Sequence, residues 1–514
     1  MTTEVRRSPD SGHLGLFAIQ DLNSGDIILE EMPLVKLAPS DEKSYDDLVS
    51  TLWASIEPPS DGSVPDYLHG IFKGMVKTAI IAIRDMHQEV IDQNKIESLL
   101  QLYHPTKEST SDTEKPIVKV ADEAINFIRE HVSTNETTAK IFSEFEDWDI
   151  LLKICLVWSC NSFQGGRIYP QLSRVNHSCN PNAVIQTTTA TQQANPEQMN
   201  DDNNTNDGQQ LVAATKIQKG SEIYISYLGL ILYTDTVVRK KKLERTKFFN
   251  CLCSRCCAAS SEGDEGAAKI PCPVFHPRDA QQMSLDEDAQ YDDDQSVRYI
   301  ALMEPKSNDK SGTDNEKLYK VLRSVCGIIE SFLETYEHNG LANTRHVNNK
   351  DSHNNDDEDE KDDIMEQHVG LSSTMMGDKH WTSNLTLLLH LDRRLSAMSK
   401  RMIVTQELPG EEEIAEAIDS LDRISRFVDS LKLDIDPGHV LGDVIIGTAR
   451  MLISLGDEKS QKYGAEWLSK IDDYVEQFAN DGVKKVVKTL KVAWTKQDRP
   501  NDDKDDSNKK AKLI

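Results

Sequence analysis

The sequence predicts an α+β fold in which short strands and amphipathic helices occupy separate stretches of the chain. Apolar runs at residues 15–18 and 26–31 flank Asn23-Ser24-Gly25, a pattern typical of two strands joined by a turn. Helical periodicity dominates the stretch that follows and also the last third of the chain. Short strands are expected again between these two helical parts, at residues 183–186, 211–214 and 222–227.

The first helical part extends from about residue 45 to residue 132, and a mostly apolar helix is expected at 142–163. Apolar residues recur at roughly helical steps in both segments, which predicts one buried face on each. In the first they are Ile71, Met75, Ile80, Ile83 and Met86, and in the second Ile150, Leu151, Ile154, Val157 and Trp158.

The C-terminal third reads as a series of amphipathic helices. Apolar residues fall at three- and four-residue steps from Ile414 to Leu431. Asp436-Pro437 should begin a new helix, because Asp caps helix starts and Pro suits the first turn, and Gly456 should end it. Further helices are expected around 467–478 and 483–492. The lengths suggest antiparallel helix pairs or a short solenoid, although no clean repeat consensus is present.

Several polar segments cannot bury enough apolar surface to fold by themselves. The Asn-, Gln- and Thr-rich segment 187–210 is therefore expected to be a disordered loop between two strands. Residues 258–313 are expected to be an acidic linker, 340–375 a disordered acidic insertion and 498–514 a disordered tail.

Composition restricts the possible partners and compartment. The 514 residues exceed what one core usually supports, which predicts two or three domains, and the net charge of −28 disfavours direct nucleic-acid binding. Three of the nine cysteines are grouped like metal ligands, which favours a reducing compartment. With no apolar N-terminal run and no apolar stretch of about 18 residues, neither a signal peptide nor a membrane span is expected. We expect a monomer in the cytoplasm, the nucleus or both.

Three groups of residues could carry chemistry. Gly12-His13-Leu14-Gly15 stands at the start of the first expected strand, where glycines either form an ordinary turn or let the backbone approach a ligand. Asn176-His177 follows the Tyr169-Pro170 turn, and Tyr227 closes an alternating strand. Taken alone, each of these is better explained by turn formation or packing than by catalysis.

The third group is Cys251-x-Cys253-x-x-Cys256, followed directly by Cys257. Three thiols within six residues are rarely packing residues, and a structural zinc needs four ligands in a tetrahedron. Cys179 is the natural fourth ligand. A closed site of this kind leaves no position for a water molecule, which argues against a zinc hydrolase.

Together these motifs resemble the SET-domain protein lysine methyltransferases, and among them the SET-and-MYND (SMYD) branch. The resemblance covers roughly the first half of the chain in order. It rests on Gly15 to Ala18, Cys160 to Phe163, Tyr169 to Asn182, Gly220 to Tyr227 and Phe249 to Cys256. The run Asn176-His177-Ser178-Cys179-Asn180-Pro181-Asn182 is its most specific element.

The resemblance implies a role for each of these residues. S-adenosylmethionine would be bound by Gly12, His13, Leu14, Gly15, Asn161, Asn176, His177 and Tyr227. Tyr227 and Phe249 would be the catalytic residues, with Phe249 walling a lysine tunnel. Cys179, Cys251, Cys253 and Cys256 would hold a structural Zn²⁺. A threaded crossing of the chain would bring Asn176 beside Tyr227.

The resemblance also implies a domain order in the first half of the chain. Residues 1–40 and 146–248 would form the SET domain, and 249–257 a zinc-binding post-SET segment. The apolar periodicity described above predicts a helical C-terminal domain at 314–497. A helical insertion at 41–145 contains no cysteine, so the MYND zinc finger usual in this branch is missing. Leu14 also replaces the polar residue usual in the glycine-rich turn.

The implied activity is S-adenosylmethionine-dependent methylation of lysines in histone or non-histone proteins. An acidic chain suits a basic peptide or histone tail as its lysine-containing substrate. The alternative is a catalytically inactive SET-fold scaffold that binds proteins through its helical C-terminal domain.

Overall fold

The computed structural model describes eleven stretches of the chain. They are residues 2–9, 12–37, 56–60, 62–106, 114–132, 145–187, 208–234, 236–257, 381–455, 457–479 and 481–497. The chain divides into two compact units. One contains Met1–Leu228 and Lys240–Ser254, and the other contains Gly229–Arg239 and Arg255–Ile514.

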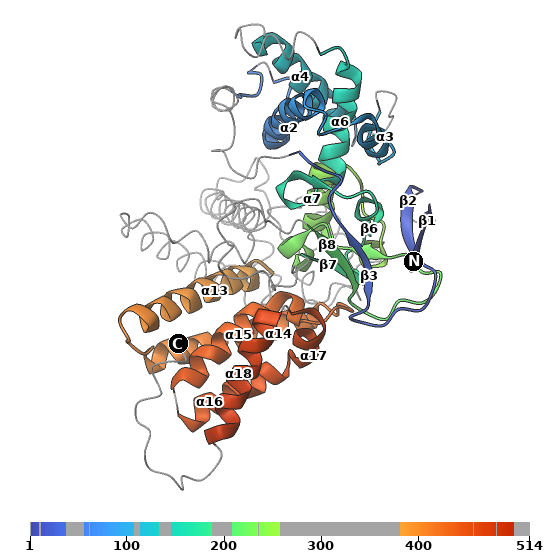
Figure 1. Ribbon diagram of the computed structural model, residues 1–514. Coiled ribbons are helices and arrows are strands. Elements are labelled where there is room, and N and C mark those ends of the chain that lie inside the picture. The colour runs from blue at the N-terminus through green and yellow to red at the C-terminus, as the bar shows by residue number, and fades with distance from the viewer. Residues whose placement is uncertain are drawn as a thin grey trace, which may run out of the picture. The chain divides into compact units, whose positions relative to one another are not determined.

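The strands of the first unit form small sheets made from segments distant in sequence (Figure 1). β1 (Thr3–Arg7) and β2 (Leu14–Ala18) form an antiparallel hairpin. β3 (Ile27–Glu31), β8 (Gln209–Ala213) and β7 (Ala183–Thr187) form a three-stranded sheet in that order. β4 (Val35–Lys36) pairs with β5 (Arg167–Ile168), and β6 (Asn176–His177) pairs with β9 (Tyr224–Ile225).

The expected pair of strands around Asn23-Ser24-Gly25 exists, but the two strands do not pair with each other. β2 pairs instead with β1, which the sequence pattern did not reveal, and β3 pairs with β8. The turn is held locally by the Asn23 amide donating to Asp26 Oδ2 at 2.7 Å, and the Gly25 amide donates to Ala213 O at 2.8 Å. Leu16, Ala18 and other apolar strand residues then fill a core beneath the sheets.

A group of helices covers one end of the first unit (Figure 1). They are α2 (His69–His87), α3 (Gln93–Leu100), α4 (Lys115–Val132) and α6 (Trp148–Asn161). The described part of the region expected to be helical at 45–132 contains α2, α3 and α4, and α6 is shorter than the expected helix at 142–163. α2, α4 and α6 pack on one another around a second core. Gly74 makes the close contact of α2 with α6 possible, because a Cβ there would lie 2.4 Å from the Trp158 ring.

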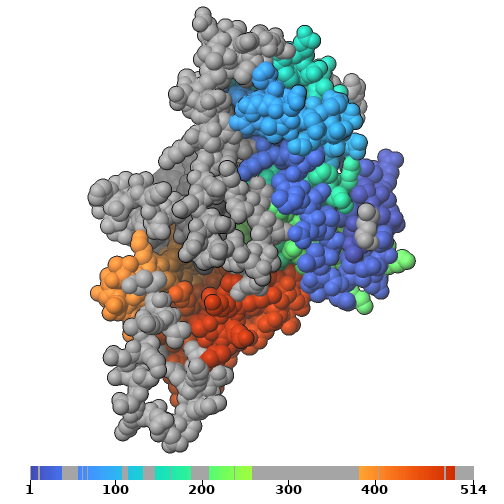
Figure 2. Space-filling view, in the orientation of Figure 1, coloured from blue at the N-terminus to red at the C-terminus, as the bar shows by residue number. Residues whose placement is uncertain are grey.

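The described part of the second unit is helical. It contains α13 (Trp381–Val404), α14 (Glu411–Ser430), α15 (Gly438–Leu455), α16 (Glu458–Ser469), α17 (Asp472–Phe478) and α18 (Asp481–Gln497). Side chains fill the spaces between these ribbons in the space-filling view (Figure 2). The single helix expected at 467–478 is instead α16 followed by α17, because Lys470 and Ile471 break the helical run between them.

α15 is the central helix of this unit. It is the one described helix long and apolar enough to cross a membrane, but 61% of it is buried and it packs on α13, α14, α16, α17 and α18. Gly464 of α16 allows a close approach of the two backbones, because a Cβ there would lie 3.2 Å from Ala449 O. Burial on several sides by neighbouring helices accounts for its apolar composition.

Some expectations fall partly or wholly outside the described residues. The linker 258–313, the insertion 340–375 and the tail 498–514 lie wholly outside them. Of the expected loop 187–210, both ends are ordered, because β7 extends to Thr187 and β8 begins at Gln209. The expected strand 222–227 is shorter, with only Tyr224–Ile225 in β9.

Candidate functional site

The Asn176-His177 pair and the segment before Tyr227 meet in a parallel pair of short strands. Asn176 lies opposite Tyr224, and His177 lies opposite Ile225. The Ser178 amide extends the pairing by donating to Ile225 O at 3.1 Å. Parallel strands cannot be joined by a tight turn, so this contact depends on the long crossover between them. Two motifs that are about fifty residues apart thereby form one site.

The turn that leads into β6 is anchored by Glu31 of β3. Its carboxylate accepts hydrogen bonds from the backbone amides of Gln171 and Leu172, at 3.0 Å and 2.9 Å. Burial raises the pKa of Glu31, while these two amides act in the opposite direction by stabilising its charge. A carboxylate at the start of the short 3₁₀ helix Leu172–Arg174 thus fixes the backbone just before Asn176.

Three rings meet on one side of the site. The centroids of His177 and Tyr227 are 5.3 Å apart, those of His177 and Phe249 6.0 Å, and those of Tyr227 and Phe249 6.4 Å. The Tyr227 hydroxyl donates to Val175 O at 2.6 Å. Burial raises the pKa of Tyr227, and the nearby Cys160 and Glu222 add to the effect. The phenol therefore stays protonated near neutral pH and is no general base.

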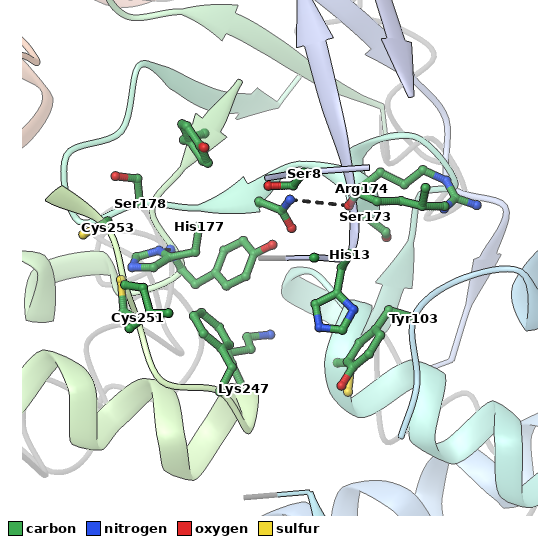
Figure 3. Close-up of a pocket in the computed structure, with 18 of the residues that line it drawn as sticks. Ser8, His13, Tyr103, Ser173, Arg174, His177, Ser178, Lys247, Cys251 and Cys253 are labelled. Atoms are coloured by element: carbon green, nitrogen blue, oxygen red, sulfur yellow. Dashed lines mark hydrogen bonds between the residues drawn. The ribbon is translucent and has the colours of Figure 1, made fainter. Parts of the chain in front are cut away.

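These rings line a cavity of about 780 Å³ in the first unit. The hairpin loop between β1 and β2, the end of α6, the β6–β9 pair and the segment after α7 (Thr236–Lys247) all contribute to it. Figure 3 shows His13 and Tyr103 on the opposite side from His177 and Cys251. The His13 and Tyr103 rings are 4.6 Å apart, and the Tyr103 hydroxyl donates to Glu114 Oε1 at 2.5 Å. The volume lies in the range of small-molecule sites.

The residues Gly12 to Gly15 do not all face this cavity. Gly12, His13 and Leu14 line it, whereas Gly15 does not. Gly12 has a φ of +71° in the hairpin loop, where its amide donates to Ser8 O, so this glycine forms part of a turn that lines the cavity. Gly15 is needed for a close approach within the protein, because a Cβ there would lie 2.3 Å from Glu222 Oε1. This packing explains the glycine, and the contact of Gly15 with the cofactor stays a prediction.

Asn161 ends α6 at the edge of the cavity with its amide group already engaged. Nδ2 donates to Val157 O and Tyr103 O, each at 2.7 Å. An amide NH₂ has two hydrogens, so both are accounted for. This side chain could therefore contact a ligand only through Oδ1, as a hydrogen-bond acceptor.

His177 links Tyr227 to the cysteine cluster. Its Nδ1 accepts from the Tyr227 amide at 3.1 Å, and its Nε2 lies 3.2 Å from Cys179 Sγ. Because Nδ1 accepts from a backbone amide, the neutral ring carries its proton on Nε2 and donates it to the sulfur. Both ring nitrogens of His177 are therefore engaged within the protein, so the predicted contact with the cofactor would be made by the backbone of His177.

Cys179, Cys251, Cys253 and Cys256 bring their sulfur atoms within 4.8 Å of one another. The Sγ atoms of Cys179 and Cys251 are 4.0 Å apart, close to the separation of about 3.8 Å that a tetrahedral zinc site with Zn–S bonds of about 2.3 Å requires. Cys257 is exposed and outside the group. These donors fit a closed, four-thiolate zinc site.

Two hydrogen-bond donors lie near the four cysteines. Four thiolates around Zn²⁺ would carry a net negative charge, and donors outside the ligand shell stabilise that charge. His177 Nε2 faces Cys179, and the fully buried Arg239 directs Nη2 toward Cys256 Sγ at 3.9 Å. Arg239 also donates to Thr234 O and to Thr236 Oγ1. Sequence analysis did not single out Arg239, because it is one of several basic residues along α7 and no motif distinguishes it from the others.

Glu222 is the main site residue that sequence analysis missed, although it belongs to a recognised motif. Its buried carboxylate accepts from Asn176 Nδ2 at 2.6 Å, Ser8 Oγ at 2.7 Å and Tyr224 OH at 3.0 Å. It therefore ties the β1–β2 hairpin to the β6–β9 pair. Tyr103, Glu114 and Lys247 also line the cavity, and no motif marked them.

Part of the chain is similar in sequence to known proteins. Residues 13–228 match the family described as "SET domain". The chain contains a SET domain. Curated proteins that are similar to parts of the chain include two histone-lysine N-methyltransferases. Histone-lysine N-methyltransferase SMYD3 of Mus musculus is 24% identical over 195 residues, which are 36% of this chain and 39% of that protein. Histone-lysine N-methyltransferase ASHR1 of Arabidopsis thaliana is 36% identical over 93 residues, covering 18% and 15%.

The chain therefore spans less than half the length of the curated relatives it matches. Among solved structures, the SET domain of LSMT bound to MeLysine and AdoHcy covers 81% of this chain and 94% of its own, with 11% identity and a TM-score of 0.32. A TM-score this low does not bear on the fold. The matched segment of the SET domain ends at Leu228, so Phe249 and the three later cysteines lie beyond it.

Proposed function

We propose that the chain is an S-adenosylmethionine-dependent protein-lysine N-methyltransferase. The observation that carries this proposal is the convergence of Tyr227, Phe249 and the Asn176-His177 pair on one cavity, reached only through the β6–β9 pairing. Three segments that are far apart in sequence thus place aromatic walls and polar groups around one space. S-adenosylmethionine would supply the methyl group on a positively charged sulfonium.

The protein's part in such a reaction is orientation and desolvation. A lysine must lose its proton to act as a nucleophile, although its ordinary pKa is about 10.4. Walls formed by Tyr227, Phe249 and His177 would disfavour the ammonium form, because burial opposes charge. The Tyr227 hydroxyl donates its hydrogen bond to Val175 O, so its oxygen lone pairs can accept from the incoming amine. Tyr227 therefore acts through positioning, as its raised pKa requires.

We infer that zinc, held by Cys179, Cys251, Cys253 and Cys256, has a structural role. Phe249 precedes Cys251 by two residues, so fixing that cysteine also fixes the ring. His177 connects Cys179 to the Tyr227 amide on the other side. The metal would thereby hold both catalytic rings without touching substrate.

For the cofactor contacts we propose Gly12, His13, Leu14, Asn161, Asn176 and the His177 backbone, which line the cavity. Asn176 is the best-defined of these, because Glu222 Oε1 and Leu14 O orient its Nδ2. His13 and Tyr103 present a ring pair on the same side, a surface suited to a flat base.

The proposed substrate is a lysine in a protein. The charged side chains that line the cavity are Arg7, Arg174, Lys247 and Glu114, so the acidity of the whole chain is not concentrated there. Because the cavity itself is not acidic, it does not require basic residues next to the target lysine. We therefore propose that the substrates include both histone and non-histone proteins. The retained Tyr227 and Asn176 do not favour the inactive-scaffold alternative. We further propose a monomer acting in the cytoplasm or nucleus.

The test is methyl transfer from isotope-labelled S-adenosylmethionine to core histones and whole lysate, with mass spectrometry of modified lysines. Tyr227→Phe should bind S-adenosylhomocysteine as the parent does, while turnover falls by about 10²-fold, the scale for losing a positioned polar group. Tyr67→Phe, at an exposed tyrosine, is the matched control and should keep parental turnover. Equal turnover in the two variants would remove Tyr227 from the mechanism.

A further inference from the structure

One amine of the chain itself lies where a substrate lysine would have to react. α7 ends at Lys247, and Figure 3 shows the Lys247 side chain projecting into the cavity. Its Nζ is 5.6 Å from the centroid of the Tyr227 ring, within the range of a cation–π contact. Phe249, two residues later, walls the same space.

The backbone holds Lys247 in this position. Phe248 has a φ of +62°, an unfavourable value for a residue with a side chain, and its ring is buried in the helical core of the first unit. This anchored turn separates Lys247 and Phe249, so that both face the cavity while Phe248 faces the core. Lys247 is thus placed by the fold and does not extend into solvent like most lysines.

The environment of Lys247 favours a neutral amine. Burial has the largest effect on the pKa of Lys247 and lowers it, while the nearby Cys160 acts in the opposite direction. Burial raises the pKa of the Cys160 thiol to about 11, so near neutral pH it carries no charge that could hold an ammonium group. The Glu114 carboxylate, which also lines the cavity, already accepts the Tyr103 hydroxyl. A larger neutral fraction makes Lys247 a better nucleophile.

We propose that Lys247 is itself a methylation site, modified in cis by the same active site. This inference rests on the proposed function. In the step, the Nζ lone pair forms a bond to the methyl carbon, and the carbon–sulfur bond breaks with its electron pair moving to sulfur. One proton then leaves the nitrogen to water, so the sulfonium becomes a neutral thioether and the amine becomes a methylamine.

The experiment uses the purified full chain and S-adenosylmethionine with a deuterated methyl group, followed by peptide mapping. The expected result is label on Lys247, with a labelled fraction that does not change when the protein is diluted, because the reaction is within one molecule. Lys242→Arg, on the same helix, is the matched control and should leave this label unchanged. Lys247→Arg should remove it. Label that falls on dilution, or label on other lysines but none on Lys247, overturns the proposal.

A second readout does not need turnover. A limiting amount of an amine-acylating reagent should modify Lys247, and saturating S-adenosylhomocysteine should protect Lys247 but not Lys242. Equal labelling of Lys247 with and without S-adenosylhomocysteine overturns the placement of its amine beside the cofactor. Methylation of added proteins with no label on Lys247 overturns this inference alone. Absence of methyl transfer to any protein, together with no binding of S-adenosylhomocysteine, overturns the proposed function as well.

Discussion

Removing the charge of Glu222 should loosen the site although this residue contacts none of the reacting groups in the mechanism above. Its carboxylate accepts from Asn176, Ser8 and Tyr224, and a carboxylate accepts more strongly than a neutral amide. In Glu222→Gln, the amide oxygen can still face Asn176 while its NH₂ group faces the two hydroxyl oxygens. The three contacts survive in weaker form. Glu222→Ala removes all of them.

The magnitudes follow from these three contacts. Losing the ionic part of each, at about 0.5–1 kcal/mol, should lower the free energy of unfolding of Glu222→Gln by about 2 kcal/mol. Losing three charge-assisted bonds at about 1.5 kcal/mol each should lower the free energy of unfolding of Glu222→Ala by about 4.5 kcal/mol. Asn176 also loses its anchor in the alanine variant. Affinity for S-adenosylhomocysteine should then fall about tenfold, equivalent to about 1.4 kcal/mol.

The assay is urea unfolding of the full chain followed by near-UV circular dichroism, with calorimetric titration of S-adenosylhomocysteine. Glu30→Gln is the matched control, because Glu30 is an exposed carboxylate whose contact with Gln210 Nε2, at 3.1 Å, lies on the surface. It should change stability by less than about 0.5 kcal/mol. Equal unfolding midpoints for Glu222→Gln and Glu30→Gln would refute the role given to the buried carboxylate.

Three other predictions concern the metal group and the helical unit. Cys253→Ser should release zinc, whereas Cys257→Ser should retain it, because only Cys253 belongs to the four-sulfur group; metal analysis of the purified variants distinguishes them. His177→Ala should weaken zinc affinity by about 10- to 100-fold through loss of the donor to Cys179, measured by chelator competition, and an unchanged affinity would contradict the link. Burial lowers the pKa of His439 to about 4 from 6.5. The folded chain therefore binds fewer protons than the unfolded chain between these values, and its free energy of unfolding should fall by up to about 3 kcal/mol as the pH drops through that window. His439→Phe should flatten the dependence in thermal unfolding scans, and an unaltered slope would argue against a neutral buried imidazole.

The parts of the fold that depend on local patterns were predicted well. The helices around Ile71 to Met86 and Ile414 to Leu431 follow from apolar spacing alone, because a buried helical face repeats every three or four residues. Strand pairing was not predictable in the same way. Nothing local marks β1 as the partner of β2, since Thr3–Arg7 is mostly exposed and its pairing replaces the turn-linked pair that the sequence suggested.

The candidate site shows the same division. Cys251, Cys253 and Cys256 could be recognised together because short spacing along the chain keeps their sulfur atoms close. Tyr103, Glu222 and Lys247 could not be assigned roles in this way. Each depends on where a distant segment places its side chain, and Lys247 depends also on the left-handed backbone at Phe248.

The amino-acid sequence by itself determined which residue types are available: a motif-bearing Asn176-His177 pair, Tyr227, and a thiol-rich segment able to hold a metal. Only the tertiary structure decided which of these meet and which atoms remain for a ligand. In the folded chain the ring nitrogens of His177 bond to the Tyr227 amide and the Cys179 sulfur, and the amide hydrogens of Asn161 bond to two carbonyls. The fold also places Lys247 in the cavity. The reason is physical: hydrogen bonds and burial are properties of neighbours in space, and neighbours in space are set by pairing across the whole chain.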